Sequence, residues 1–249
     1  MKIIKRILCS TILFACTNCT LQHLNGFPVI LEDDTIIESG KAETNGLFYF
    51  TSYADDEAGG FWEVFADIRY GIKTDKLNLC VFIPLTHTWK EDNGSETTET
   101  GIGDISLFLK TKLYDNLYLM PGLMLPTGNE NKELGEGKIA FSATAVYKLK
   151  LRRADIFLNC SVLFLNQPDA SYGIAYNLPV SDRTDIVVET YGESGGSGTM
   201  LSAAPGLTYA LKQDKLYIAA STQIPFFYSD NFTDDKFPYM PYIGITYEH

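Results

Sequence analysis

An alternating pattern of polarity, repeated along most of the chain, constrains the fold of this 249-residue protein more than any other feature. The clearest case is residues 138–151, where every second side chain from Ile139 to Leu151 is apolar or aromatic. The intervening positions include Lys138, Lys148 and Lys150. A period of two residues is that of a β-strand and not of a helix. The pattern therefore predicts a strand with one apolar and one polar face.

The same pattern recurs from residue 43 to the end of the chain and predicts an all-β protein of about twelve strands. Short turns and longer loops alternate between these strands, as in an antiparallel up-and-down barrel of the outer-membrane kind. The predicted strands are 43–52, 62–73, 76–87, 101–114, 117–127, 137–151, 154–165, 170–181, 184–192, 199–211, 214–226 and 237–248, and the predicted longer loops are 53–61, 88–100, 128–136, 166–169, 193–198 and 227–236.

The number of strands decides which face of the sheet meets solvent. A soluble lipid-binding barrel would turn its apolar face inward, whereas a membrane barrel turns it towards lipid. About eight strands already enclose a space that side chains fill, so about twelve would leave a void unless the lumen is polar and hydrated. We therefore expect the apolar faces to contact lipid and the charged faces to point into water. The predicted lumen-facing residues are Glu63, Asp67, Arg69, Asp104, Lys110, Lys112, Lys148 and Lys150.

Aromatic residues gather at the predicted strand ends, where a membrane barrel has its two interfacial girdles. An aromatic ligand cage is the alternative interpretation. The last residues, 243–249, combine a glycine with alternating side chains and resemble the C-terminal signal that the barrel-assembly machinery recognises, with His249 in place of the usual aromatic residue. The girdle candidates are Tyr53, Phe61, Trp62, Trp89, Tyr114, Tyr118, Tyr172, Phe226, Phe227, Tyr228, Tyr239 and Tyr242.

The N-terminus has the features of a secretory signal peptide, which we assign to residues 1–19. Lys2, Lys5 and Arg6 precede an apolar run at 7–15, and that run is too short for a helix that crosses a bilayer. Residues 13–16 also resemble a lipoprotein cleavage box that ends at Cys16. Export and a barrel together predict localisation in a bacterial outer membrane. Residues 20–42 are then an N-terminal periplasmic or plug-like segment, and residues 43–249 are the barrel.

The net charge of −11 argues against nucleic acid as a partner, because a phosphate backbone requires a basic surface. Most of the acidic excess falls in the predicted long loops. Such an acidic rim could bind divalent cations shared with lipopolysaccharide, or it could only keep the loops hydrated. Outer-membrane lipid, lipopolysaccharide and a small solute are therefore the predicted partners.

Signals for enzymatic or metal chemistry are weak. Gly192-Glu-Ser194-Gly-Gly196 matches the G-x-S-x-G pattern of serine hydrolases, but the one histidine that follows it is the terminal His249. His87 has no recognisable catalytic partner motif beside it. Cys80 and Cys160, the two cysteines outside the N-terminal region, do not define a disulfide framework or a zinc site. We therefore predict no enzyme activity, no cofactor and no metal.

Several short motifs, in a consistent order, resemble the bacterial outer-membrane family named for the MetA pathway of phenol degradation. They are PVILEDDTIIESGK at 28–41, Pro84, Gly101-Ile-Gly103-Asp104 followed by Lys110, Pro126-Thr127-Gly128 and Gly135-Glu-Gly137. This family consists of transporter-like barrels placed near the FadL-type channels for hydrophobic compounds. The resemblance implies passage of small, hydrophobic or aromatic compounds through an outer membrane.

Two functional hypotheses follow. The first is a channel for passive uptake of small solutes, in which the charged lumen residues set selectivity. The second is a non-conducting structural or adhesive surface barrel with acidic outer loops. Within the N-terminal segment, Glu32, Asp33, Asp34 and Lys41 are candidates for a latch or a lumen plug that meets inward lysines, and a solvated periplasmic tail is the alternative.

Overall fold

The computed structural model of this chain describes residues 36–53, 59–72, 76–92, 95–132, 134–164, 168–195, 198–212, 216–229 and 240–248. The predicted signal peptide and the latch candidates Glu32, Asp33 and Asp34 lie outside these residues. Among the described residues, no helix is long and apolar enough to cross a membrane.

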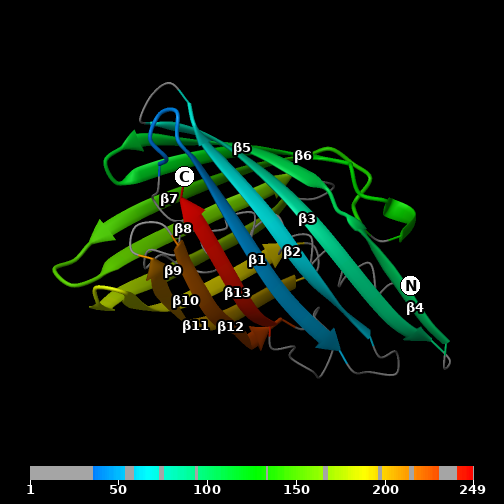
Figure 1. Cartoon of the computed structure of the whole chain (residues 1–249). Coiled ribbons are helices and arrows are strands. Elements are labelled where there is room, and N and C mark those ends of the chain that lie inside the picture. The colour runs from blue at the N-terminus through cyan, green and yellow to red at the C-terminus, as the bar shows by residue number, and fades with distance from the viewer. Residues whose placement is uncertain are drawn as a thin grey trace.

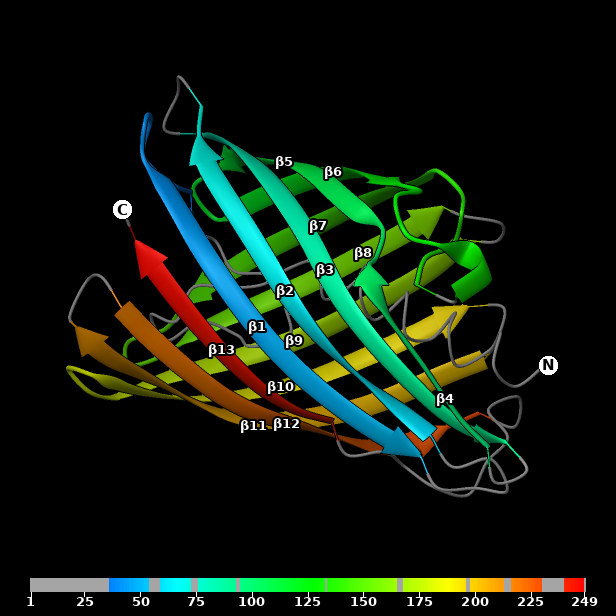
Figure 2. The ribbon, with the colours of Figure 1, turned by 45° about the vertical axis from the view of Figure 1, so that its right-hand side comes forward.

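The described strands form one antiparallel sheet that closes into a twelve-stranded barrel (Figure 1, Figure 2). Apart from β4 and β5, neighbouring strands in the sequence pair with each other, and β1 pairs with both β2 and the last strand, β13. Because β3 pairs with β4 near one end and with β5 near the other, β4 and β5 act as two parts of one strand. The strands are β1 (Ala42–Tyr53), β2 (Gly59–Gly71), β3 (Leu77–Asp92), β4 (Ser95–Ile102), β5 (Ile105–Tyr114), β6 (Leu117–Leu125), β7 (Ala140–Lys150), β8 (Asp155–Phe164), β9 (Pro168–Ser181), β10 (Thr184–Gly195), β11 (Gly198–Lys212), β12 (Leu216–Tyr228) and β13 (Met240–Glu248).

The predicted all-β barrel and its strand number are confirmed, and most predicted ends agree to within three residues. The largest correction concerns the predicted loop 88–100. There β3 continues to Asp92 and forms an extended hairpin with β4, with Leu85 opposite Ile102 and Asp92 opposite Ser95. Pro84 lies within β3.

The acidic loops also require correction. Asp169 belongs to β9 and Glu193 to β10, so neither is a loop residue, and Glu193 is buried. The alternation of polarity had identified both strands correctly but had begun β9 too late and ended β10 too early. The acidic residues 55–57 and 234–235 lie outside the described residues.

The outer face of the barrel is apolar, as the lipid-facing interpretation predicted. On β2, Ile68 is 41% exposed, whereas its neighbours Asp67 and Arg69 are each 2% exposed. Large hydrophobic side chains occupy the outward positions of nearly every strand, and water-soluble monomers rarely expose such a continuous apolar belt. The belt includes Val64, Leu79, Leu109, Leu119, Tyr147, Ile174, Val188, Leu207, Ile218 and Ile243.

A charge placed in this belt is expected to destabilise the barrel in a depth-dependent way. Val188, near the middle of β10, is 43% exposed on the outer face. Val188→Arg should lower the free energy of unfolding in lipid vesicles by about 2–4 kcal/mol, because arginine near the bilayer midplane costs that much. Urea titration of the vesicle-inserted protein measures the loss. Phe226→Arg near the end of β12 is the matched control and should cost at most about 1 kcal/mol. Equal losses in the two variants would contradict the proposed orientation.

The predicted aromatic girdle is confirmed only in part. Tyr114, Tyr172, Phe226 and Phe227 are exposed on the outside. Phe61, Tyr118 and Tyr242 are instead buried, because their places in the alternation turn them inward. The outer face of β1–β3 carries further ring contacts, in which Trp62 stacks on His87 with centroids 5.1 Å apart and Phe50 stacks on Trp89 at 5.6 Å.

Candidate functional site

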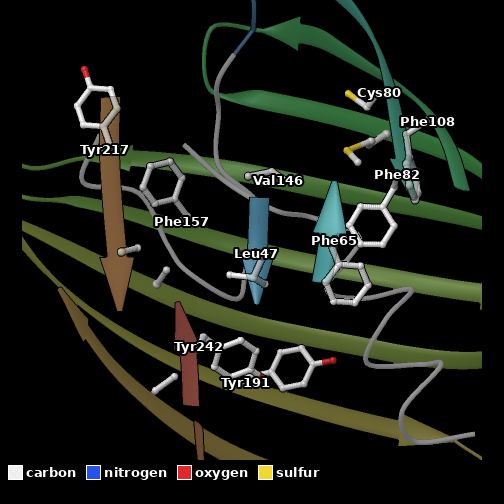
Figure 3. Close-up of a cluster of buried hydrophobic side chains, with 14 of the residues drawn as sticks. Leu47, Phe65, Cys80, Phe82, Phe108, Val146, Phe157, Tyr191, Tyr217 and Tyr242 are labelled. Carbon is white, nitrogen blue, oxygen red and sulfur yellow. The ribbon is translucent and has the colours of Figure 1, made fainter. Parts of the chain in front are cut away.

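The candidate site is the interior of the barrel, which is more apolar than the sequence interpretation implied. Aromatic rings point inward from β2, β3, β5 and β8, and Phe65 and Phe82 stack with their centroids 4.5 Å apart (Figure 3). The ring of Phe108 lies over Gly122, where a Cβ atom would come within 2.4 Å of it. The inner apolar cluster also contains Leu47, Cys80, Met120, Val146, Phe157 and Tyr217.

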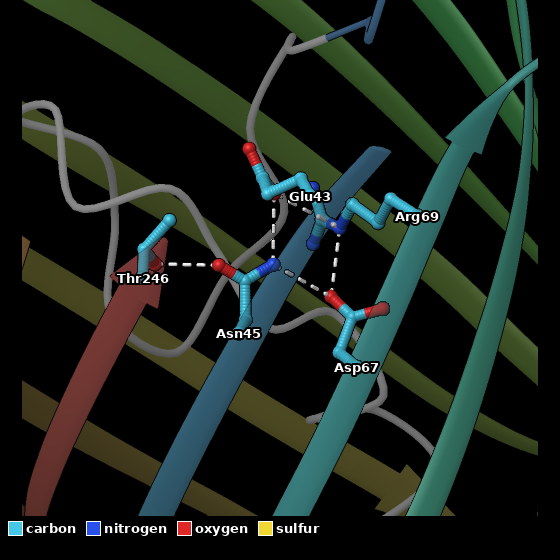
Figure 4. Close-up of polar contacts among 5 residues, drawn as sticks. All are labelled: Glu43, Asn45, Asp67, Arg69 and Thr246. Carbon is cyan, nitrogen blue, oxygen red and sulfur yellow. Dashed lines mark hydrogen bonds and ion pairs between the residues drawn. The ribbon is translucent and has the colours of Figure 1, made fainter. Parts of the chain in front are cut away.

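A buried polar network crosses the seam where the last strand meets the first (Figure 4). Arg69 Nε donates to Asp67 Oδ2 at 2.7 Å and lies 3.9 Å from Glu43 Oε1. Asn45 Nδ2 donates to Glu43 Oε1 at 2.8 Å and to Asp67 Oδ2 at 3.2 Å, and the hydroxyl of Thr246 donates to Asn45 Oδ1. The network therefore links β13, β1 and β2 through charged groups that are out of contact with solvent.

The predicted lumen charges do not all point into water. Glu63, Asp67, Arg69 and Lys110 are 6%, 2%, 2% and 0% exposed, so they are buried, and Thr86 donates a hydrogen bond to Glu63. The prediction of hydrated charges is therefore wrong for these four. The prediction assumed that every side chain on the polar face is hydrated. Aromatic side chains share that face, however, and exclude water from it.

The three remaining lysines lie near the short turns. Lys112 Nζ is 3.4 Å from Asp115 Oδ1 beside the turn that follows β5. Lys148 Nζ is 3.0 Å from Asp155 Oδ2 and 5.2 Å from the centroid of the Phe157 ring. Lys150, the last residue of β7, is exposed. These lysines thus belong to the end of the barrel where strands connect by short turns.

Asp104 organises a loop. It lies in the break between β4 and β5, and its carboxylate accepts hydrogen bonds from the backbone N–H groups of Gly128 and Glu136, at 2.8 and 2.7 Å. A Cβ atom on Gly135 would lie 2.4 Å from Asp104 Oδ1, so glycine permits this approach. Asp104 was predicted as a lumen charge, and the structure shows that its carboxylate binds the loop between β6 and β7.

The motifs that carried the family resemblance converge around this carboxylate. Gly103 N–H donates to the Pro84 carbonyl at 2.9 Å, and the Thr127 hydroxyl donates to the Gly103 carbonyl at 2.9 Å. The same hydroxyl oxygen accepts from the N–H of Ile105 at 2.9 Å. Hydrogen bonds therefore join three segments that are separate in the sequence, namely 101–104, 126–128 and 135–137.

The wall formed by β10–β13 is polar and carries buried carboxylates. Glu189 and Glu193 on β10 are 0% and 3% exposed, and the Tyr191 hydroxyl donates to Glu193. On the adjoining strands, Tyr242 donates to Gln223 Oε1 at 2.9 Å and Gln223 Nε2 donates to Ser202 Oγ at 2.8 Å. Sequence reasoning missed this wall, although Glu189 falls at an inward position of a predicted strand and Glu193 follows directly after it.

The described part of the N-terminal segment turns towards the barrel interior. Ile37 is buried, and Ile36 packs against the inner apolar cluster. The chain crosses Gly71 so closely that a Cβ atom there would lie 2.0 Å from the Glu38 carbonyl oxygen. Lys41, a predicted latch residue, instead forms an exposed ion pair with Glu38 at 2.6 Å.

The two candidate catalytic residues, Ser194 and His87, each lie beside the hydroxyl group of a threonine. Ser194 lies within β10, with its hydroxyl 3.2 Å from that of Thr199 on β11. His87 lies within β3, and its Nδ1 is 2.7 Å from the hydroxyl of Thr100. Across the described ranges, no group of three or more histidine, cysteine or acidic side chains is arranged to hold a metal ion.

No family model and no curated protein matches this sequence. Solved structures nevertheless share its fold. The COG4313 outer membrane channel from Pseudomonas putida F1 superposes with a TM-score of 0.66 and 14% identity, over 88% of this chain and 100% of that one. The translocator domain of autotransporter NalP from Neisseria meningitidis reaches 0.55 at 9% identity, over 86% of this chain and 89% of that one.

A third neighbour, the CymD monoaromatic hydrocarbon channel, superposes with a TM-score of 0.50 and 8% identity, over 86% of this chain and 89% of that one. At such low identities the likeness concerns the fold alone. Together with the apolar outer belt, it shows that the chain has the fold of outer-membrane β-barrel channels.

Proposed function

We propose that this protein is an outer-membrane channel for passive uptake of small hydrophobic or aromatic solutes. The observation that carries the proposal is the aromatic inner face. A porin for hydrophilic solutes lines its bore with polar groups, whereas here Phe65, Phe82 and Phe157 point inward and are at most 1% exposed. An apolar solute can make contacts with such rings, and these contacts replace the ones that the solute makes with lipid or with other solutes.

The inner face also carries charged side chains beside the aromatic rings, namely Glu43, Asp67, Arg69 and Lys110. The similar fold of the CymD monoaromatic hydrocarbon channel adds support. We further propose that lipopolysaccharide surrounds the outer rim and that the barrel-assembly machinery inserts the chain.

Single-channel recording in planar bilayers tests the proposal. The wild-type barrel should show discrete conductance steps, and benzyl alcohol, a neutral aromatic solute, should interrupt the current. Phe82→Ala should shorten these interruptions by about 2- to 10-fold, because an aromatic pair contributes about 0.5–1.5 kcal/mol beyond its buried area. Phe227→Ala on the lipid face is the matched control and should leave them unchanged. A barrel without conductance steps would favour the non-conducting surface barrel.

A further inference from the structure

The β3–β4 hairpin leaves one strand of the sheet with a neighbour on one side only. Among the described strands β4 pairs with β3 alone, whereas every other strand has at least two neighbours (Figure 1). On the far side, β6 pairs with β5 only as far as Leu125, which lies opposite Ile105, so it ends before it reaches β4. A strand edge without a neighbour presents a row of unpaired backbone N–H and C=O groups.

The register of the hairpin shows which groups form this edge. Gly103 N–H donates to the Pro84 carbonyl at 2.9 Å, next to the β3–β4 ladder. Bonded and non-bonded pairs alternate along an antiparallel ladder, so the odd-numbered residues of β4 bond to β3. The even-numbered residues turn their N–H and C=O groups away from β3, and we call this row the free edge of β4. It consists of Glu96, Thr98, Thr100 and Ile102.

The loop between β6 and β7 does not cover the free edge. It contacts the inner face of β4 through side chains, because Lys132 Nζ lies 2.8 Å from Glu99 Oε2 and a Cβ atom on Gly101 would lie 2.8 Å from Leu134 Cδ1. The outer face of β4 carries Thr100, whose hydroxyl lies 2.7 Å from His87 Nδ1. These contacts use the two faces of the strand and leave its edge open.

The free edge lies in water above the bilayer. Unpaired backbone groups cannot lie in hydrocarbon, and residues 96–100 of β4 are threonine and glutamate on both faces. Glu96, Thr97, Thr98 and Thr100 are exposed. In outer-membrane barrels the longer loops lie outside the cell and the short turns face the periplasm. The free edge is therefore accessible to molecules outside the cell.

The strand lacks the features that usually prevent pairing at an edge. Proteins protect exposed edges with lysine, proline or a β-bulge. The eight residues of β4 include neither lysine nor proline, and its register with β3 continues without a shift from Leu85–Ile102 to Asp92–Ser95. Threonine, the most frequent residue of β4, also favours an extended backbone. The edge is thus a regular template for one more strand.

Charge favours a basic partner strand. Residues 90–99 contain four acidic residues and one lysine, and Glu96 on the free edge is exposed. Opposite charges on directly facing residues of two strands stabilise their pairing, and like charges destabilise it. A lysine or arginine opposite Glu96 would therefore stabilise an added strand.

Geometry argues against a second copy of this chain as the partner. Strands of such barrels tilt by about 35–45° from the barrel axis, so a two-fold axis along the membrane normal would make two β4 strands cross at about 70–90°. Antiparallel pairing requires nearly opposite directions. Two acidic edges would also repel each other.

We propose that the free edge of β4 binds an extended, basic segment of a polypeptide outside the cell by addition of an antiparallel strand. The backbone groups of Glu96, Thr98, Thr100 and Ile102 supply the affinity, and Glu96 selects a basic residue on the partner strand. This interaction is independent of the proposed channel, because the free edge lies outside the barrel interior.

Fluorescence anisotropy with a labelled octapeptide of alternating lysine and threonine tests the site on the full barrel in detergent. The lysine amides face β4 when the lysines lie opposite Glu96, so their N-methylation should weaken binding at least about tenfold. N-methylation of the threonine amides is the matched control and should leave the affinity unchanged. Equal effects of the two modifications would overturn strand addition.

Two variants of the protein locate the peptide. Glu96→Gln should weaken binding about 2- to 5-fold, the contribution of a cross-strand charge pair. Asp182→Asn, in the exposed turn between β9 and β10, is the matched control and should bind as the wild type does. Thr98→Pro removes an N–H of the free edge, retains the bonds to β3 and should weaken binding at least about tenfold. Heat-modifiable gel migration shows whether each variant is folded.

Three further results would overturn the proposal. Wild-type affinity in folded Thr98→Pro would place the peptide elsewhere, and equal losses in Glu96→Gln and Asp182→Asn would indicate a general effect of charge. A dimer in detergent that Thr98→Pro dissociates would identify a second copy as the partner. Single-channel conductance is measured separately, so failure of peptide binding leaves the channel proposal intact.

Discussion

Arg69→Leu should lower the free energy of unfolding of the barrel by about 3–5 kcal/mol, the cost of leaving a buried charge without its partner. The Arg69 guanidinium lies 2.7 Å from the Asp67 carboxylate and 3.9 Å from that of Glu43, and these three side chains are at most 2% exposed. The variant leaves two buried carboxylates close together, in a region that hydration cannot reach. Urea titration of the vesicle-inserted protein measures the loss.

Two further variants define the origin of this effect. Lys41→Leu breaks an ion pair whose side chains are 58% and 70% exposed, and it should cost less than about 1 kcal/mol. Combining Arg69→Leu with Glu43→Gln and Asp67→Asn removes the uncompensated charges and should restore most of the stability. If Arg69→Leu were no more harmful than Lys41→Leu, the network would not stabilise the seam between β13 and β1.

The sequence predicts the barrel well because alternation along a strand is a local signal. Each strand from β5 to β13 shows it within a dozen residues, and the closed sheet follows from the number of such strands. The β3–β4 hairpin does not show this alternation and was therefore not predicted. Residues 95–100 are mostly threonine and glutamate on both faces, because both faces of the hairpin meet water, and a strand without an apolar face has no alternation to detect.

The interior was less predictable because a side chain that points inward is not thereby hydrated. Whether Lys110 meets water or protein depends on residues of other strands that share the lumen, and these are distant in the sequence. The partners of Asp104 show the same limit, because Gly128 and Glu136 follow it by 24 and 32 residues. The sequence shows that a carboxylate follows a glycine at this position, but only the folded structure identifies the backbone amides that the carboxylate binds.

Asp104→Ala should release the loop between β6 and β7. The carboxylate accepts two backbone N–H groups, at 2.8 Å from Gly128 and 2.7 Å from Glu136. Each charge-assisted bond contributes about 1.5–3 kcal/mol, so the loop should lose about 3–6 kcal/mol of local stability. Hydrogen exchange at these two amides, followed by mass spectrometry, should accelerate by at least about a hundredfold.

The loop should detach without unfolding the barrel, because Asp104 bonds to loop amides while β5 and β6 keep their own ladder from Ile105 and Leu125 onward. Asp104→Asn retains one acceptor oxygen and should give an intermediate rate of exchange. Asp182→Ala, in the exposed turn between β9 and β10, is the matched control and should leave Gly128 and Glu136 protected. If exchange in Asp104→Ala stayed at the wild-type rate, the loop would be held by the packing of Leu134, which is 6% exposed, and not by the carboxylate.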